Sequence, residues 1–363
     1  MNVPDQRGGE QPSPIRRRRP RYSGTHPKSF EQKYKEHDVE AHPELREHLR
    51  GKGVTPAGTH VAVLMDEVMA HLSPRPGEIV ADCTVGYGGH ASEFLKRLGP
   101  SGRLIAFDVD NAELERTRDR LSKDGAPVSF YRSNFAGIAN VLSQEKIDGY
   151  DVIFADLGVS SMQIDDPQRG MSYKHDGPLD MRMDSRLKRT GADLLNSLSQ
   201  EQLSEALLEL ADEPDHQEIA RRIVGERVAQ PIARTSQLVQ LVLAAKGLTA
   251  RAWRQQQRGS KSGLLHPAAR TFQALRILVN DELDSLRELL RVAPYCLRPA
   301  GRIGIISFHS GEDRLVKNSF REGVRNGTYQ SAAPDAIVPQ AKEIASNPRS
   351  ASAKFRWAIK LAS

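Results

Sequence analysis

The sequence predicts an α/β protein whose parallel sheet is interrupted by an all-helical segment. From residue 61 to about 160, short apolar strand patterns alternate with helical patterns, which is typical of a parallel sheet with right-handed crossovers. From about 164 to 265 helical patterns continue without a convincing strand. Strand patterns return near the C-terminus, so the helical segment is interpreted as an insertion into one α/β unit.

The first elements follow from hydrophobic periodicity. In the segment 61–72, apolar residues recur on one helical face from Val61 to Leu72. The segment 151–156 is almost continuously apolar, as a strand buried on both faces requires. The other elements predicted in this half are strands at 78–84, 104–108 and 128–131 and helices at 91–98 and 111–121.

The insertion is predicted to hold helices at 194–211, 216–228 and 236–245. Asp193 is a candidate N-cap of the first helix and Thr235 of the third. Ser199 and Gln202 have capping-box spacing, which leaves open that the first segment forms two helices. After the insertion we expect one long helix at 267–292, a turn at 299–301, and strands at 302–308 and 354–360.

Composition narrows the class of protein. The chain has 363 residues, a net charge of +6 and only two cysteines, Cys83 and Cys296, so neither a disulfide framework nor a four-thiolate metal site is expected. It has no apolar run of membrane-spanning length, and its N-terminus does not resemble a signal peptide. Residues 1–55 are rich in proline and include the run Arg16–Arg19, which predicts a disordered basic tail. This tail either adds affinity for RNA phosphates or is simply solvated.

A glycine-rich turn follows the first predicted strand. Gly86, Gly88 and Gly89 lie where a ligand can approach the backbone and meet the unpaired N–H groups of a helix. The next strand ends in Asp108, which can accept both hydroxyls of a ribose. His90 stands where a dinucleotide fingerprint would continue, and Asp82 precedes the turn, where an acid can meet an ammonium. These features favour S-adenosylmethionine over a dinucleotide, although a tight turn without a ligand is the simpler alternative.

Further motifs make the interpretation specific. The chain resembles the bacterial small-subunit ribosomal RNA cytosine-N4 methyltransferase family over residues 60–360. The motifs that carry the resemblance are the runs 82–90, 156–161 and 270–276, together with 60–64, 176–184, 305–310, 347–349 and 352–354.

The resemblance implies a Rossmann-like methyltransferase fold with a parallel central sheet and an inserted helical domain. The methyltransferase domain is expected at 56–163 and 266–363, and a substrate-recognition insertion at 164–265. The implied reaction is methylation of the exocyclic N4 amine of a cytidine in the decoding centre, with small-subunit ribosomal RNA or the assembled small subunit as partner. The implied compartment is the cytoplasm, with no membrane and no metal. The cofactor contacts carried over from the family are Gly88, Gly89, His90, Asp108, Phe135, Asp156 and Gln163.

Three positions depart from the family pattern. Tyr87 stands before the paired glycines, which is expected to narrow the turn. Gly311 replaces a bulky apolar residue, which is expected to loosen the loop after His309. The basic segment that usually precedes the final strand is thin here, around Lys342.

The candidate catalytic residues are Asp156 and His309. Asp156 ends the fourth strand, where it can contact the cofactor, accept a hydrogen from the target amine, or simply form a turn. The Asp-Pro-Pro-Tyr motif of many amino methyltransferases is missing there, so an aromatic clamp for the base must come from elsewhere. His309 either bonds phosphate or base, or is an ordinary strand-end histidine.

The candidate RNA contacts are Arg270, Gln273, Arg276 and Arg349. The first three share one stripe of the predicted long helix, which suits phosphate positioning or is merely a solvated face. Three other functions compete with an RNA methyltransferase. They are a non-catalytic ribosome-assembly factor with a vestigial fold, a nicotinamide-dependent dehydrogenase, and a DNA cytosine methyltransferase.

Overall fold

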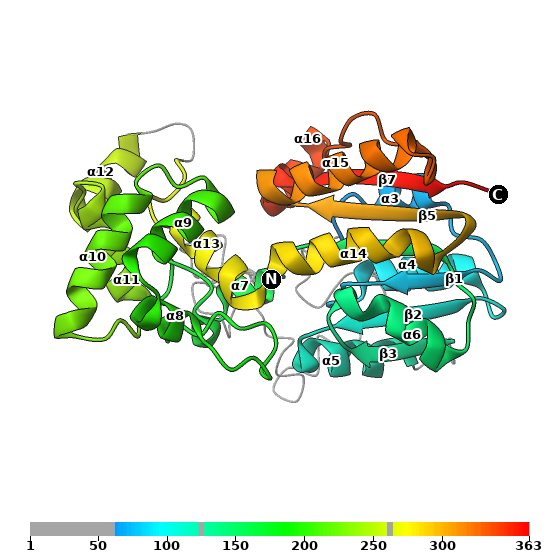
Figure 1. Ribbon diagram of the computed structural model, residues 1–363, viewed down its shortest axis with the longest axis horizontal. Coiled ribbons are helices and arrows are strands. Elements are labelled where there is room, and N and C mark those ends of the chain that lie inside the picture. The colour runs from blue at the N-terminus through cyan, green and yellow to red at the C-terminus, as the bar shows by residue number, and fades with distance from the viewer. Residues whose placement is uncertain (1–61, 123–126, 260–263, 363) are drawn as a thin grey trace, which may run out of the picture.

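A seven-stranded sheet forms the larger part of the computed structural model, which describes residues 62–122, 127–259 and 264–362 (Figure 1). The strand order is β3-β2-β1-β4-β5-β7-β6, and β7 runs antiparallel to both of its neighbours. This topology confirms the predicted α/β class with a parallel central sheet. The strands are β1 (Ile79–Asp82), β2 (Arg103–Asp108), β3 (Val128–Arg132), β4 (Tyr150–Asp156), β5 (Leu297–Ser307), β6 (Tyr329–Ala332) and β7 (Lys354–Lys360).

Helices cover both faces of the sheet because strand side chains alternate between the faces. In β2, Leu104 and Ala106 belong to one buried cluster, whereas Ile105 and Phe107 belong to the other. The first cluster is completed by α3 (Met65–Leu72), α4 (Gly89–Leu98) and α5 (Asn111–Leu121). The second is completed by α6 (Ile138–Glu145), α14 (Glu282–Cys296) and α15 (Ser310–Arg325).

The sheet has a topological switch point between β1 and β4. From β1 the chain moves outward through β2 and β3 on one side, and β4 and β5 lie on the other. In open α/β sheets, ligands bind in the crevice beyond the carboxyl ends of the strands at such a point. The fold therefore predicts a ligand site among the residues that follow β1, β2 and β4.

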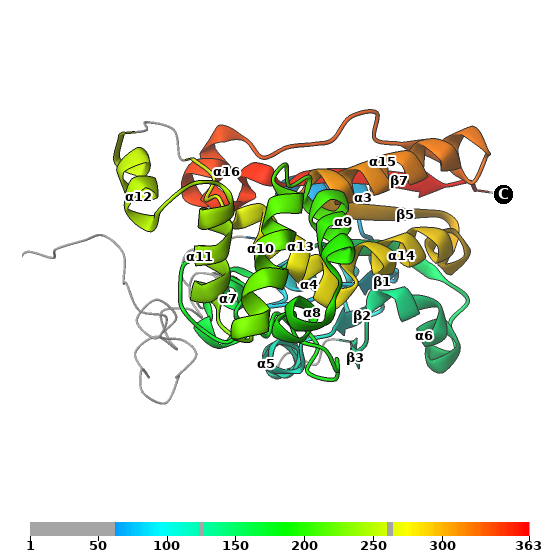
Figure 2. The same cartoon turned by 60° about the vertical axis from the view of Figure 1, so that its left-hand side comes forward.

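A separate group of helices lies beyond one end of the sheet (Figures 1 and 2). Its helices are α8 (Gly191–Ser197), α9 (Gln200–Ala211), α10 (His216–Ala229), α11 (Thr235–Ala245) and α12 (Ala250–Gly259). Ser199 and Gln202 form the predicted capping box, so the segment 194–211 is confirmed as parts of two helices. The predicted caps Asp193 and Thr235 are wrong. Thr190 caps α8, and the Thr235 hydroxyl instead donates to the His175 carbonyl at 2.8 Å.

The predicted single helix at 267–292 is also wrong. The chain forms α13 (Ala269–Asn280) and α14, separated by Asp281, whose φ of 52° is left-handed. The two helices serve different cores: Phe272 and Leu275 pack among the separate helices, whereas Leu286 packs against the sheet. The break lets one continuous segment join the two parts of the molecule.

Several other elements were not predicted. They include α6, α15, β6 and the short helices α7 (Ser161–Asp165), η3 (Phe135–Gly137), η4 (Pro167–Arg169), α16 (Ala341–Ser346) and η5 (Pro348–Ser352). β5 begins earlier than predicted and takes up the expected turn as an irregularity, with Ala300 at a φ of 58°. No helix within the described ranges is both long enough and apolar enough to cross a membrane. The predicted basic tail, residues 1–55, lies outside the described residues.

Candidate active site

A cavity of about 970 Å³ lies where the carboxyl ends of β1, β2 and β4 face α13 and the segment 171–187. Its size is near the upper end of the roughly 300–1,000 Å³ that is usual for ligand sites. Almost all predicted site residues line it, but Arg270 does not. The predicted residues that line it are Gly88, Gly89, His90, Asp108, Phe135, Asp156, Gln163, Gln273, Arg276, His309 and Arg349.

The glycine-rich turn is shaped by packing behind it. Gly88 has a φ of 70°, and a Cβ there would lie 2.7 Å from Nη2 of Arg120 and 2.8 Å from Cγ2 of Thr117. A Cβ on Gly89 would lie 2.9 Å from Cβ of Ala62. Both glycines are therefore required by neighbouring side chains, whatever a ligand requires. Tyr87, which was expected to narrow the turn, has the Arg120 guanidinium 4.6 Å from its ring centroid.

Asp108 is held at the end of β2 by backbone N–H groups. Its Oδ2 accepts a hydrogen bond from Gly86 at 2.8 Å, and its Oδ1 accepts one from Asp110 at 2.9 Å. Burial raises the pKa of Asp108 to about 6, although these hydrogen bonds oppose the rise. Because each carboxylate oxygen has two lone pairs, both oxygens can still accept a ligand hydroxyl.

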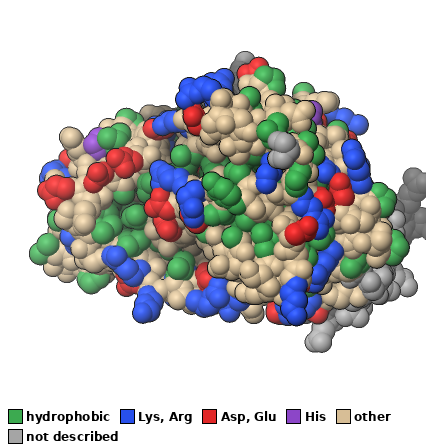
Figure 3. Space-filling model, turned by 45° about the vertical axis from the view of Figure 1, so that its right-hand side comes forward, with side chains coloured by type: hydrophobic (Ala, Val, Ile, Leu, Met, Phe, Trp, Pro, Cys, Tyr) green, Lys and Arg blue, Asp and Glu red, His purple; other side chains and the backbone are tan. Residues whose placement is uncertain are grey.

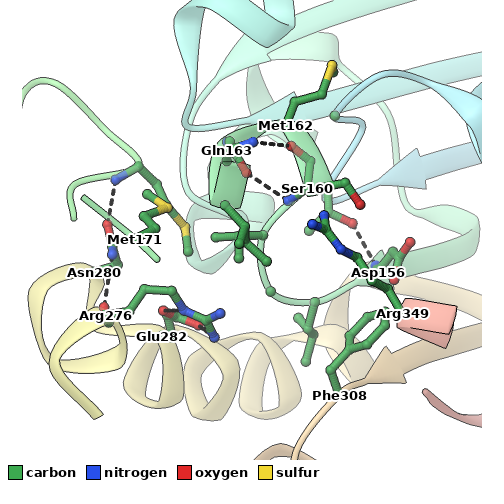
Figure 4. A pocket seen from close by; sticks show the side chains of 18 of the residues that line it. Asp156, Ser160, Met162, Gln163, Met171, Arg276, Asn280, Glu282, Phe308 and Arg349 are labelled. Carbon is green, nitrogen blue, oxygen red and sulfur yellow. Dashed lines mark hydrogen bonds and ion pairs between the residues drawn. The ribbon is translucent and has the colours of Figure 1, made fainter. Parts of the chain in front are cut away.

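Asp110, which was not among the predicted site residues, connects this end of the pocket to the start of the helical segment. Its side chain is almost fully buried, and its Oδ2 lies 2.6 Å from Nη2 of Arg169 and 2.9 Å from Nε2 of Gln163. Gln163 also completes a capping box with Ser160 (Figure 4). Gln163 is thus anchored between β2 and the turn after β4.

Asp156 ends β4 with a buried carboxyl. Its Oδ1 has no hydrogen-bond partner among the described residues, and burial raises its pKa to about 8, with smaller contributions from Asp82 and Glu312. His90 lies beside it, with Nδ1 3.8 Å from Oδ2 of Asp156. Burial lowers the pKa of His90 to about 4, so its ring is neutral near pH 7. The Nε2 of His90 lies 3.0 Å from the Val63 carbonyl, which can only accept, so Nε2 carries the proton and Nδ1 is an acceptor.

Asp82, considered for contact with an ammonium, is only 1% exposed and does not line the cavity. Burial raises its pKa to about 7. Because it lies beneath the turn, its effect on the pocket is electrostatic.

His309 caps α15 from the pocket wall. Its Nδ1 accepts from the Glu312 backbone N–H at 3.4 Å, and its Nε2 lies 3.2 Å from Oε1 of Glu312. A Cβ on Gly311 would lie 3.1 Å from Nδ1 of His309, so the glycine that departs from the family pattern gives the ring room. This geometry explains His309 as a structural cap, and its catalytic role stays a prediction.

The predicted stripe is divided: Gln273, Arg276 and Asn280 line the cavity, whereas Arg270 does not. Arg276 forms a bidentate ion pair with Glu282 across the break between α13 and α14 (Figure 4). Its Nε lies 2.8 Å from Oε1 of Glu282, and its Nη2 lies 2.9 Å from Oε2. Asn280 accepts from the Met183 N–H at 2.7 Å and donates to the Met181 carbonyl at 2.8 Å. Arg270 instead donates to the Asp212 carbonyl, away from the cavity. On the face seen in Figure 3, Lys and Arg side chains are interspersed with Asp and Glu rather than gathered in one patch.

Aromatic side chains missed by the sequence reasoning also line the cavity. Tyr173 stacks on His266 with ring centroids 4.3 Å apart, and Phe272 meets Tyr173 edge-on. Phe308 follows β5 and also lines the pocket. Tyr173 and His266 are 93 positions apart, so no local pattern could have paired them.

The pocket's groups suit S-adenosylmethionine. A buried carboxyl for a ribose, a turn with backbone N–H groups at a helix start, and the aromatic Phe135 occupy neighbouring strand ends. Asp156 ends β4, the neighbour of β1, so a second ligand can approach the bound cofactor near this carboxyl.

Comparison with known proteins supports one family. A model described as the MraW methylase family matches residues 57–361. A protein from Lachnoclostridium phytofermentans named ribosomal RNA small subunit methyltransferase H 1 is 43% identical over 355 residues, covering 97% of this chain and 95% of that protein. A protein from Geobacter sulfurreducens named ribosomal RNA small subunit methyltransferase H is 42% identical over 318 residues, covering 84% of this chain and 99% of that protein. A solved methyltransferase homologue from Pyrococcus horikoshii is 15% identical with a TM-score of 0.38, covering 83% of this chain and 67% of that one, which is too weak a likeness to add to the sheet topology.

Proposed function

This chain belongs to the MraW methylase family, and we propose that its pocket transfers a methyl group from S-adenosylmethionine to the exocyclic N4 amine of a cytidine in small-subunit ribosomal RNA. The observation that carries the proposal is the presence of Asp108 and Asp156 in one cavity, at strand ends on either side of the switch point. A cofactor bound at Asp108 can therefore meet a methyl acceptor bound at Asp156. The Rossmann-like methyltransferase fold follows from the family and the sheet together.

The chain's own residues divide into those that hold the cofactor and those that face the acceptor. Asp108 accepts the ribose hydroxyls, the 86–90 turn offers backbone N–H groups, and Phe135 lies where an aromatic ring can pack against adenine. Gln163 stays in place through Asp110 and Ser160. When bound, S-adenosylmethionine supplies an electrophilic methyl group on a sulfonium.

Asp156 is the candidate acceptor for a hydrogen of the target amine. The cytosine amine is a poor nucleophile because its lone pair is delocalised into the ring, so orientation and hydrogen-bond acceptors matter. The amine must lose a proton as its nitrogen gains a methyl group, and the ionised Asp156 carboxylate can take it. The neutral His90, with Nδ1 3.8 Å away, keeps an acceptor rather than a positive charge beside it.

The separate helices are the proposed substrate-recognition part. We keep the predicted insertion at 164–265 as the segment that meets the RNA, and α13 supports it by packing Phe272, Leu275 and Val279 into the same core. Arg276 and Gln273 line the cavity from this side and are proposed to face the RNA near the target base. Either free ribosomal RNA or the assembled small subunit, in the cytoplasm, is the proposed partner.

Two measurements test this function. Calorimetry with S-adenosylmethionine should detect binding, and nucleoside mass spectrometry should detect N4-methylcytidine after incubation with unmodified small subunits. A chain that binds the cofactor but methylates neither the subunit nor its RNA would instead be the non-catalytic assembly factor.

A further inference from the structure

We infer that Arg349 determines specificity for the target base by donating hydrogen bonds to the acceptor atoms N3 and O2 of cytosine, while Asp165 holds its guanidinium in place. This inference rests on the proposed function. It makes the sequence-based prediction that Arg349 contacts the RNA more specific.

The guanidinium of Arg349 is fixed at one nitrogen. Arg349 lies in η5, just before β7, and its Nη2 is 2.7 Å from Oδ1 of Asp165 in α7. The Asp165 side chain is buried, whereas the Arg349 side chain is one-third exposed, so the pair lies at the edge of the buried region. The second nitrogen, Nη1, is buried and has no hydrogen-bond partner among the described residues. Buried donors are almost always satisfied, so this one calls for a partner that a ligand would supply.

A complementary unpaired atom occurs in the same cavity. Asp156 and Arg349 both line it and lie on the same side of the view in Figure 4. Oδ1 of Asp156 is likewise buried without a hydrogen-bond partner. The pocket thus presents a carboxyl oxygen and a guanidinium donor whose hydrogen-bonding capacity is unused.

The Asp156 carboxyl and the Arg349 guanidinium together match the hydrogen-bonding edge of cytosine. Cytosine carries a donor at N4 and acceptors at N3 and O2, and an Arg side chain can only donate. Asp156 then meets the N4 amine that reacts, and Arg349 meets the acceptors beside it. Uracil has an acceptor at position 4 and a donor at N3, so it would oppose Asp156 with an oxygen and Arg349 with an N–H. Leaving buried polar groups of a site unpaired is the strongest way to reject an analogue.

Two anionic groups are less suitable partners for Arg349 than the cytosine. The methionine carboxylate of the cofactor belongs at the turn after β1, whereas Arg349 is anchored to α7, beyond the end of β4. An RNA phosphate is carried on the outside of the strand, whereas Nη1 is buried within the cavity wall. A flipped base is the ligand group that reaches such a depth.

The test uses the full chain with small subunits from cells that lack this enzyme, and matched subunits with uridine in place of the methylated cytidine. The variants are Arg349→Ala, Arg349→Lys and Asp165→Asn, and the control is Arg291→Ala, which removes an exposed ion pair with Glu288 on α14. The measurements are cofactor affinity, single-turnover methylation at saturating subunits, the salt dependence of subunit binding, and the ratio of affinities for the two kinds of subunit.

We expect both Arg349 variants to slow single-turnover methylation by about 10- to 100-fold, the range for hydrogen bonds to a charged group. Cofactor affinity and the salt slope should match those of Arg291→Ala, and the preference for cytidine over uridine subunits should disappear. Asp165→Asn should weaken the same preference. If Arg349→Ala does not fold, Arg349→Lys decides, because it keeps the charge but not the planar fork.

Three results would overturn the inference. Loss of cofactor binding would assign Arg349 to the cofactor. A salt slope reduced by about 0.7 would assign it to one phosphate of single-stranded RNA. An unchanged preference for cytidine would remove it from base recognition. Failure of the wild-type chain to form N4-methylcytidine would instead contradict the proposed function, so the two failures are distinguishable.

Discussion

Asp108 provides the sharpest residue-scale prediction. Replacing it with alanine removes the carboxyl that we assign to the ribose hydroxyls and should weaken S-adenosylmethionine binding by about 1.5–3 kcal/mol, the range for hydrogen bonds to a charged group. Calorimetry measures this directly. The matched control is Asp119→Ala on α5, the helix that follows β2, because Asp119 is exposed and does not line the cavity. Equal affinities for the two folded variants would remove Asp108 from the cofactor site.

The role proposed for Asp156 predicts that the methylation rate depends on pH. Burial raises its pKa to about 8, and only the ionised carboxylate can accept the proton from the amine. Below that pKa, the single-turnover rate at saturating cofactor should therefore rise about tenfold per pH unit and level off above it. Asp156→Asn should be slow and lack this limb. A wild-type rate that stays constant between about pH 6 and 9 would contradict a role for this carboxylate as proton acceptor.

The glycine turn gives a prediction at the scale of an element. Gly88→Ala should destabilise the fold more than Gly247→Ala, since both glycines have a φ near 70° but only Gly88 is crowded by Arg120 and Thr117. The shared backbone penalty is about 1–2 kcal/mol for an L-residue in the left-handed region. Denaturant unfolding of the two variants measures the difference. Equal losses would mean that the side chains behind Gly88 move aside without cost.

Strand ends and helix faces could be predicted from the sequence because their signals are local. β2, β4 and β7 carry apolar patterns along their length, so the strands that end in Asp108 and Asp156 could be predicted. That both carboxyls belong to one cofactor site was implied by the family resemblance. The break at Asp281 could not be predicted. It carries neither glycine nor proline, and its left-handed backbone follows from α13 and α14 packing into different cores.

The walls of the pocket were also hard to predict, because they are formed by residues that are distant in the sequence. Tyr173 with His266, and Arg349 with Asp165, are joined only by the tertiary fold. The stripe that contains Arg276 was expected either to position RNA phosphates or to be a solvated face. Periodicity gives the direction of a side chain but does not identify the group opposite it. In this chain the opposite group is Glu282.

At the scale of the whole molecule, the basic tail should be separable from the catalytic unit. The family match begins at residue 57, and the run Arg16–Arg19 precedes it. A chain that begins at residue 56 should methylate at the normal rate with saturating subunits but bind RNA less tightly at low salt. Four lost phosphate contacts would lower the salt slope by roughly 3, at about 0.7 per contact. Identical slopes would mean that the arginines do not touch RNA, and lost turnover would mean that the tail helps to build the site.

Methyl transfer to the N4 amine of a cytidine in small-subunit RNA can be tested directly. Its most direct test is incubation of the full chain with small subunits from cells lacking the enzyme and S-adenosylmethionine carrying a ¹³C methyl group. Nucleosides from the RNA are then separated by chromatography and identified by mass spectrometry. We predict label in N4-methylcytidine from small-subunit RNA and none in large-subunit RNA treated in parallel. Label in the 5-methyl isomer, label in large-subunit RNA, or no label from a chain that binds the cofactor would contradict the account.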